Sequence, residues 1–443
     1  MEQIVRGATV VTLDPRRRIL PATDVSIRNG RIHALGEALK PVEGECEEIP
    51  AAGKLLLPGL VQAHVHLCQT LFRNAAEDLP LLPWLRERIW PLEAAHDEAS
   101  MAASARLGLA ELIRGGTTAA LDMGSVHHTG AILEAAREAG FRLTGGKAHM
   151  DRAPETPARL QEDSDASLAE AEALCRRWNG AEGGRLHYAF APRFVLACSD
   201  DLLAAVGELA EKNVARLHTH AGEAREECAA VETRFGAANV EVLARFGLLG
   251  PGTVLAHGVH LAAREADLLA ESGTHLVHCP SANLKLGSGV APIPMLAARG
   301  IPLALGADGA ACNNRLDAWT EMRLAALIHN PAGGPGALPA QTVLEMATLG
   351  GARALGLEEE IGSIEPGKQA DLVLVGLDRP HLVPAGPDPA ALLVYCAGRA
   401  DVERVWIAGR PVFRDGRLTT LDEGAVRARG LEQAARIVEC AFS

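Results

Sequence analysis

Short apolar segments with the character of β-strands recur eight times along the middle of the chain, and longer segments separate them. The strand candidates are residues 60–66, 117–124, 142–149, 186–194, 215–222, 253–260, 274–280 and 301–309. The intervening segments, such as 101–116 and 200–213, repeat apolar residues every three or four positions and end in Gly or Asn, which is typical of helices. Such alternation predicts a parallel sheet, and eight repeats predict a (β/α)8 barrel of the TIM type.

The two ends of the chain have a different pattern, in which short β-type runs alternate with turn signals. The first part runs from Ile4 to about Leu57 and contains the hairpin dipeptide Asn29-Gly30. Similar runs return at 362–377 and 404–418. Because neither end has enough strands to be stable alone, we expect both to form one small β-sandwich domain. The predicted division is 1–58 for its first part, 59–358 for the barrel, and 359–443 for its second part with a C-terminal helix.

Polar side chains that bind metals or carry protons stand at the C-terminal ends of five strand candidates. They are His64 and His66 on the first, His218 and His220 on the fifth, His257 on the sixth, His278 on the seventh and Asp308 on the eighth. In a (β/α)8 barrel these ends converge on one mouth, where active sites lie. A single His-x-His pair is equally typical of a strand that gives way to a loop, but the repetition on five strands favours a common site.

Two histidines of the first strand share a face, because side chains alternate along a strand. His64 and His66, with one histidine of the fifth strand and Asp308, would give a divalent ion three nitrogens and one oxygen, with room for a water. This is the pattern of a catalytic zinc site, and iron(II) or manganese would also suit it. The ion would lower the pKa of its water toward neutrality.

A carboxylate that could move protons lies beside the fifth strand. Glu223 follows His220 by three residues and fits the role of a general acid and base. Its alternative role is that of a first-turn glutamate favoured by the helix dipole. Likewise, His257 by itself would be interpreted as a core histidine.

Composition limits the partners and the compartment. The net charge is −13 and no basic run stands out, which argues against nucleic acid and anionic membranes as partners and favours a small-molecule substrate. The nine cysteines form no C-x-x-C pair. The N-terminus lacks a signal-peptide core, and no apolar stretch approaches the roughly 20 residues of a membrane span. We therefore expect a cytoplasmic protein.

Five motifs, in the order in which they occur, resemble those of the amidohydrolase superfamily. They are PGLVQAHVH, HTHAGE, LAHGVH, HCPSANLKLGSG and LGADGAACNN. Within the superfamily they are similar to the branch of cytosine, guanine and adenosine-derivative deaminases and triazine hydrolases, and the resemblance covers almost the whole chain. It implies one metal ion held by His64, His66, His220 and Asp308. Glu223 would be the proton shuttle, His257 would orient the water or the leaving group, and Asp308 would also accept a proton. Relatives often form homo-oligomers.

The segment after the first strand, residues 75–93, resembles the specificity loop of methylthioadenosine and S-adenosylhomocysteine deaminases. In those relatives the positions of Trp84 and Glu93 contact the nucleoside, and the acid accepts the ribose hydroxyls. A carboxylate suits a vicinal diol, and an indole packs well on an apolar sugar or thioether. The alternatives are a loop anchor for Trp84 and a solvated helix residue for Glu93.

The fourth strand departs from the adenosine-type pattern. It carries Arg193, in the run 191–194, where that group commonly has a histidine, and it resembles guanine deaminases there. An arginine suits an oxo-purine, a pterin or a substrate carboxylate. Cys312 also replaces a frequent serine. We expect a deaminase of an adenosine derivative, namely 5′-deoxyadenosine, methylthioadenosine or S-adenosylhomocysteine. The alternatives are a guanine, oxo-purine or pterin deaminase, an s-triazine chloro- or aminohydrolase, and a metal-binding protein without catalysis.

Overall fold

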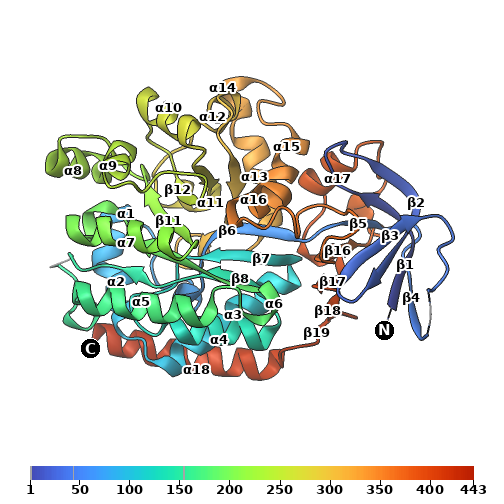
Figure 1. The fold of residues 1–443 in the computed structure, drawn as a ribbon, viewed down its shortest axis with the longest axis horizontal. Helices are drawn as coiled ribbons and strands as arrows, with labels where there is room; N and C mark the ends of the chain where they lie inside the picture. The colour runs from blue at the N-terminus through green and yellow to red at the C-terminus, as the bar shows by residue number, and fades with distance from the viewer. Residues whose placement is uncertain (1, 43, 153–154) are drawn as a thin grey trace.

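A computed structural model describes residues 2–42, 44–152 and 155–443. Parallel strands surrounded by helices form one large domain, and strands from both ends of the chain form a smaller one beside it (Figure 1). The expected (β/α)8 barrel and the small domain built from both termini are therefore confirmed. The proposed boundaries at 58 and 358 stay a prediction.

The barrel strands follow one another in chain order around the sheet. They are β6 (Leu60–His66), β7 (Thr117–Asp122), β8 (Arg142–Gly145), β9 (Ala148–His149), β10 (Leu186–Pro192), β11 (Arg216–Ala221), β12 (Thr253–His257), β13 (His275–His278), β14 (Leu303–Leu305) and β15 (Asp308–Gly309). The third and eighth predicted strands are each split in two. The eighth closes the barrel, because β14 pairs with β13 and β15 pairs with β6, all in parallel.

Helices separate most of the strands, and many of them cover the outside of the barrel (Figure 1). They are α1 (Leu81–Trp84), α2 (Trp90–Ala94), α3 (Glu98–Arg114), α4 (Thr129–Ala139), α5 (Ser164–Trp178), α6 (Ala181–Gly184), α7 (Asp200–Lys212), α8 (Arg225–Phe235), α9 (Asn239–Arg245), α10 (Ala263–Ser272), α11 (Pro280–Lys285), α12 (Ile293–Ala298), α13 (Ala318–Ile328), α14 (Asn330–Gly333), α15 (Ala340–Glu345), α16 (Gly351–Leu355), α17 (Pro389–Tyr395) and α18 (Glu423–Phe442). The last helix, α18, packs against α3 and α2. Within the described residues, no helix combines the length and hydropathy needed to span a membrane.

The small domain is one hydrogen-bonded sheet. Its strands are β1 (Glu2–Val11), β2 (Ile19–Arg28), β3 (Arg31–Gly36), β4 (Cys46–Pro50), β5 (Leu55–Pro58), β16 (Leu372–Val375), β17 (Val402–Ile407), β18 (Arg410–Arg414) and β19 (Arg417–Leu418). The two ends of the chain meet where β5 pairs antiparallel with β16. The sheet has its own apolar core, which includes Val25, Leu56 and Trp406. Neither end of the chain could complete this core alone.

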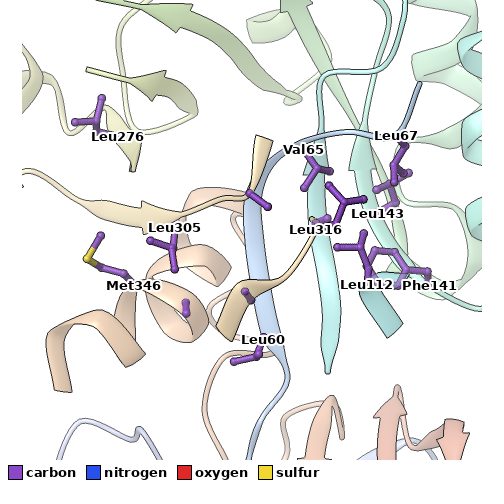
Figure 2. Close-up of a cluster of buried hydrophobic side chains, with 14 of the residues drawn as sticks. Leu60, Val65, Leu67, Leu112, Phe141, Leu143, Leu276, Leu305, Leu316 and Met346 are labelled. Carbon is purple, nitrogen blue, oxygen red and sulfur yellow. The ribbon is translucent and has the colours of Figure 1, made fainter. Parts of the chain in front are cut away.

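The first barrel strand supplies apolar residues to two clusters. Leu60 and Val65 join the cluster shown in Figure 2, which extends to the helices around the barrel. Val61 and Ala63 join a second cluster, with small residues of the other strands. The pairing of β6 with β7 shifts between Gln62 and Val65. Such an irregularity re-aims side chains, and here His64 lies within it and His66 follows it.

Candidate active site

Three histidines and one aspartate converge at the C-terminal ends of β6 and β11 and at the start of β15. Asp308 Oδ1 lies 3.2 Å from His64 Nε2 and 3.4 Å from His66 Nε2. His66 Nε2 lies 3.3 Å from His220 Nε2. The ligand atoms of His64, His66 and Asp308 form one close group, and those of His64, His220 and His257 form a second group that shares His64.

The protonation state of these groups also suits a metal. Burial lowers the pKa of His66 well below its usual value, and neighbouring His64 lowers it further. The pKa of His220 is lowered for the same reasons. Burial acts to raise the pKa of Asp308, but the charge and hydrogen bond of His64 outweigh it and hold that pKa well below its usual value. Neutral imidazoles and an ionised carboxylate are the forms that bind a cation.

His64, His220 and His257 each use the Nδ1 atom of the ring in a contact that orients the side chain. His64 Nδ1 is 2.7 Å from His218 Nε2. His220 Nδ1 lies 2.6 Å from the carbonyl oxygen of Arg193, to which it donates. His257 Nδ1 is 2.8 Å from Asn283 Oδ1. These contacts leave the Nε2 atoms facing the centre, as is usual for metal-ligating histidines.

Two residues of the site have a backbone conformation that is rare for side chains with a Cβ. His257 has φ +79° and Asp308 has φ +63°. Both stand at the strand ends that face the mouth, where His257 Nε2 lies 3.8 Å from Asp308 Oδ2. Strain of this kind persists where the surrounding structure enforces it and is concentrated at functional sites.

The predicted proton carrier faces the same centre. Glu223 Oε2 lies 3.5 Å from His257 Nε2. Burial, followed by the charges of Asp308 and Glu227, raises the pKa of Glu223 well above its usual value. A carboxyl group with a raised pKa holds its proton to a higher pH than usual, which suits it to deliver that proton to a substrate.

A cavity opens in front of these groups. Its walls are His66, Gln69, Leu81, Trp84, Leu85, Arg193, Phe194, His220, Glu223, Glu227, His257 and Asp308. The space that it leaves for water-sized molecules is about 30 Å³, well below the roughly 300 to 1,000 Å³ of typical small-molecule sites. A wider cleft lies between α3 and the small domain, but its cations are largely paired with carboxylates, such as Arg114 with Glu423 and Lys54 with Glu403.

The three predicted substrate contacts occupy different positions. Trp84 and Arg193 lie on the cavity wall, and Trp84 Nε1 donates to the carbonyl oxygen of Ala76. Glu93, on α2, is not among the wall residues that the structure describes. Its carboxylate is buried behind the wall, where it accepts hydrogen bonds from Arg193 and Gln69.

Some residues of the site have roles that the sequence did not predict. His218 and Asn283 orient the histidines, and Gln69 forms part of the wall. The sequence indicated both His218 and His220 as candidate metal ligands on the fifth strand. Their spacing alone does not determine which of them faces the centre of the site. His278, also at a strand end, lies beside His329 with 5.6 Å between ring centroids and lines no part of the described cavity wall.

Comparison with known proteins gives one consistent result. The amidohydrolase family pattern matches residues 55–412. The chain is 41% identical to a 5-methylthioadenosine/S-adenosylhomocysteine deaminase of Syntrophobacter fumaroxidans, covering 95% of this chain and 94% of that protein. It is 40% identical to a 5′-deoxyadenosine deaminase of Methanothermobacter thermautotrophicus, covering 93% and 94%. Among solved structures, an adenosine deaminase from Xanthomonas campestris with bound zinc superimposes with a TM-score of 0.92 at 34% identity, covering 99% and 98%.

Proposed function

Since the chain belongs to the amidohydrolase family, we propose that it is a metal-dependent deaminase that hydrolyses an adenosine derivative and releases ammonia. The substrates we propose are 5′-deoxyadenosine, methylthioadenosine and S-adenosylhomocysteine, on which the similar enzymes are named as acting. The observation that carries the proposal is the cavity in which the carboxyl group of Glu223, with its raised pKa, lies among His66, His220, His257 and Asp308.

The proposed ligands of the metal are His64, His66, His220 and Asp308. We expect zinc, which the similar Xanthomonas structure holds, with iron(II) and manganese as alternatives. When bound, the ion would lower the pKa of a water molecule and so make hydroxide available near neutral pH.

The remaining steps fall to groups of the chain. Glu223 donates its proton to the ring nitrogen next to the carbon under attack, and Asp308 accepts a proton from the attacking water. His257, held through Nδ1 by Asn283, orients the water and the departing amine. The carbon–nitrogen bond to the exocyclic amine then breaks, so that water and the amino-purine become an oxo-purine and ammonia.

Trp84 and Arg193 are the proposed substrate contacts on the cavity wall. The indole of Trp84 would pack on the sugar or its 5′ substituent, and Arg193 would donate hydrogen bonds to the heterocycle. Because Arg193 reaches the wall, deamination of an oxo-purine or a pterin is the second candidate function.

All nine cysteines are free thiols, which supports our proposal of a cytoplasmic enzyme. By analogy with relatives we propose a homo-oligomer.

The proposal is tested by measuring ammonia release from 5′-deoxyadenosine, methylthioadenosine, S-adenosylhomocysteine, guanine and a pterin with zinc-loaded protein. We expect turnover of the first three, and release from guanine or the pterin alone would contradict the proposal. Glu223→Gln should keep the metal content and lower kcat by about 10²- to 10⁴-fold. Glu226→Gln, three residues further along and exposed, is the matched control and should be unchanged.

A further inference from the structure

A second buried carboxyl group is bonded to the backbone of the proposed proton carrier. Glu227 lies on α8, four residues after Glu223, and its exposed fraction is 2%. Its Oε2 accepts a hydrogen bond from the backbone nitrogen of Glu223 at 2.9 Å, and the backbone nitrogen of Ala224 donates to the same carboxylate. Its Oε1 accepts a hydrogen bond from Asn239 Nδ2. The chain itself therefore supplies donors to both oxygens of Glu227.

The turn that leads into Glu223 is tight and is fixed from two sides. Gly222 has φ +62°, and a Cβ on it would lie 3.1 Å from the carbonyl oxygen of His260. The carbonyl oxygen of Gly222 accepts a hydrogen bond from the backbone nitrogen of His260 at 2.9 Å. At the next residue Glu227 takes over, because it accepts the backbone N–H of Glu223. The direction of the Glu223 side chain thus depends on both contacts.

A simpler role for Glu227 is to complete the start of a helix. A glutamate at the third helical position commonly accepts the backbone N–H of the residue before the helix. Here that residue is Ala224, whose side chain makes no capping hydrogen bond. A bond to Ala224 alone would serve this purpose. The carboxylate is instead buried, is held by Asn239 from α9, and extends its bonding to Glu223, which helix capping does not explain.

The charge of Glu227 is a second way in which it could act on Glu223. The pKa of Glu223 is raised by burial first, then by the charge of Asp308, and only then by the charge of Glu227. Burial also raises the pKa of Glu227, against the hydrogen bond from Asn239. Because Asp308 has the larger effect, Glu227 is not the main reason that Glu223 holds its proton.

We propose that Glu227 is a positioning residue, which holds the backbone of Glu223 so that the carboxyl group of Glu223 faces His257 and the reacting centre. It acts through the length of its side chain and not through its charge, and it needs no contact with the substrate. Asn239 holds Glu227 in turn. The inference rests on the proposed function for the role of Glu223 as proton carrier.

The first test separates the length of this side chain from its charge, with zinc-loaded protein and 5′-deoxyadenosine. Glu227→Gln keeps the length: its Oε1 can accept from Glu223, and its amide can donate to Asn239 Oδ1, which is buried and has no partner among the described residues. Glu227→Asp keeps the charge but is one methylene shorter.

The two variants should differ in kcat. We expect Glu227→Asp to lower kcat about tenfold or more and to change KM by less than about twofold, since one hydrogen bond is worth about a factor of ten and the affected step is proton transfer. Glu227→Gln should lower kcat by about threefold at most, because the bond to Glu223 can form again. The reverse order of the two variants would overturn the inference.

The second test measures whether Glu227 acts through Glu223. In the Glu223→Gln background, Glu227→Asp should change the remaining kcat by less than about twofold, because the residue to be positioned no longer carries a proton. An equal loss in both backgrounds would contradict the positioning role. Glu226→Asp, at the exposed neighbouring position, is the control and should be unchanged.

Zinc content and thermal unfolding are measured for every variant. If Glu227→Asp does not fold, Asn239→Ala takes its place, because it removes a donor to Glu227 and leaves the carboxylate in the chain. It should lower kcat by about threefold or more in the wild-type background. An unchanged kcat would then refute the inference.

Failure of the proposed function would be distinguishable from failure of this inference. If Glu223→Gln keeps full activity, the proton-carrier role is wrong and the inference fails with it. If Glu223→Gln loses activity while Glu227→Asp keeps it, only the inference is wrong. If wild type acts on guanine and not on adenosine derivatives, the substrate proposal is wrong, and the same order of variants is expected with guanine, because the proton carrier is the same.

Discussion

At the scale of single residues, Gly309 leaves the space in which the side-chain amide of Gln69 lies at the cavity wall. In Gly309→Ala the new Cβ would meet Gln69 Oε1 at 2.2 Å, and the flexible amide would move aside. We expect kcat/KM to fall about tenfold while the free energy of unfolding changes by less than about 1.5 kcal/mol. Gly252→Ala is the control, because a Cβ there meets no atom within 4 Å. A loss of stability without loss of activity would contradict the role of Gln69.

Single residues also mark where prediction from sequence ends. His64, His66, His220 and Asp308 could be predicted as a group, because strand periodicity and barrel topology together fix where strand ends point. The hydrogen bond between Gln69 and Glu93 could not be predicted, since the two residues stand 24 positions apart and on different elements. The packing of the folded chain determines such side-chain partners, and no regular interval in the sequence identifies them.

At the scale of elements, a pair of adjacent glycines explains why the third barrel strand is split into β8 and β9. A Cβ on Gly146 would lie 1.7 Å from the carbonyl oxygen of Ala189 on β10, whereas a Cβ on Gly145 would have ordinary contacts at 3.5 Å or more. Gly146→Ala should therefore destabilise the protein by about 3 kcal/mol or prevent folding, because a backbone oxygen cannot move aside. Gly145→Ala should change stability by less than about 1 kcal/mol. Urea denaturation checks both, and equal effects would contradict the close approach.

The segment between β6 and α3 shows what periodicity could and could not predict for an element. Its resemblance placed Trp84 and Glu93 together on one specificity loop. The structure forms α1, a π-helical turn at Leu85–Ile89 and α2 there. This helical path puts Trp84 on the cavity wall and Glu93 behind it. The extra residue of a π-turn rotates the side chains that follow it. The spacing of apolar residues in the sequence does not predict that rotation.

A buried carboxyl group on α13 makes the packing of α11 sensitive to pH. Glu321 accepts hydrogen bonds from the backbone nitrogen of Ser281 and from Asn313 Nδ2, and burial raises its pKa from 4.5 to about 7. The folded state thus binds more protons than the unfolded state between these values, so stability falls as pH rises from about 4.5 to about 7. The shift corresponds to about 3 kcal/mol.

The variant Glu321→Gln isolates this contribution, because it cannot ionise. Urea denaturation of zinc-loaded wild type and variant is measured at pH 5 and pH 8. Wild type should lose stability relative to the variant on going to pH 8. A difference between the two proteins that is the same at both pH values would refute the raised pKa.

At the scale of the whole molecule, the sequence indicated that the two ends of the chain build one domain, because each end has too few strands to be stable by itself. The pairing of β5 with β16 meets that expectation. The way this domain is joined to the barrel was not predictable. Arg142, at the start of β8, donates to both oxygens of Asp371, next to β16, at 2.9 and 3.0 Å, with side chains that are 0% and 1% exposed. Nothing near either residue in the sequence marks the other as its partner.

This ion pair should behave differently when one partner or both are removed. Asp371→Ala leaves the Arg142 charge buried without a counter-ion and also removes an acceptor for the backbone nitrogen of Ala408. We expect a loss of about 3 to 5 kcal/mol in the free energy of unfolding. The double variant Arg142→Met with Asp371→Leu should recover most of it, because it buries no charge. Glu432→Ala, which breaks the exposed pair with Arg429, should cost less than about 0.5 kcal/mol. If the double variant is as unstable as Asp371→Ala, the two domains depend on the hydrogen bonds of this pair and not on the balance of its charge.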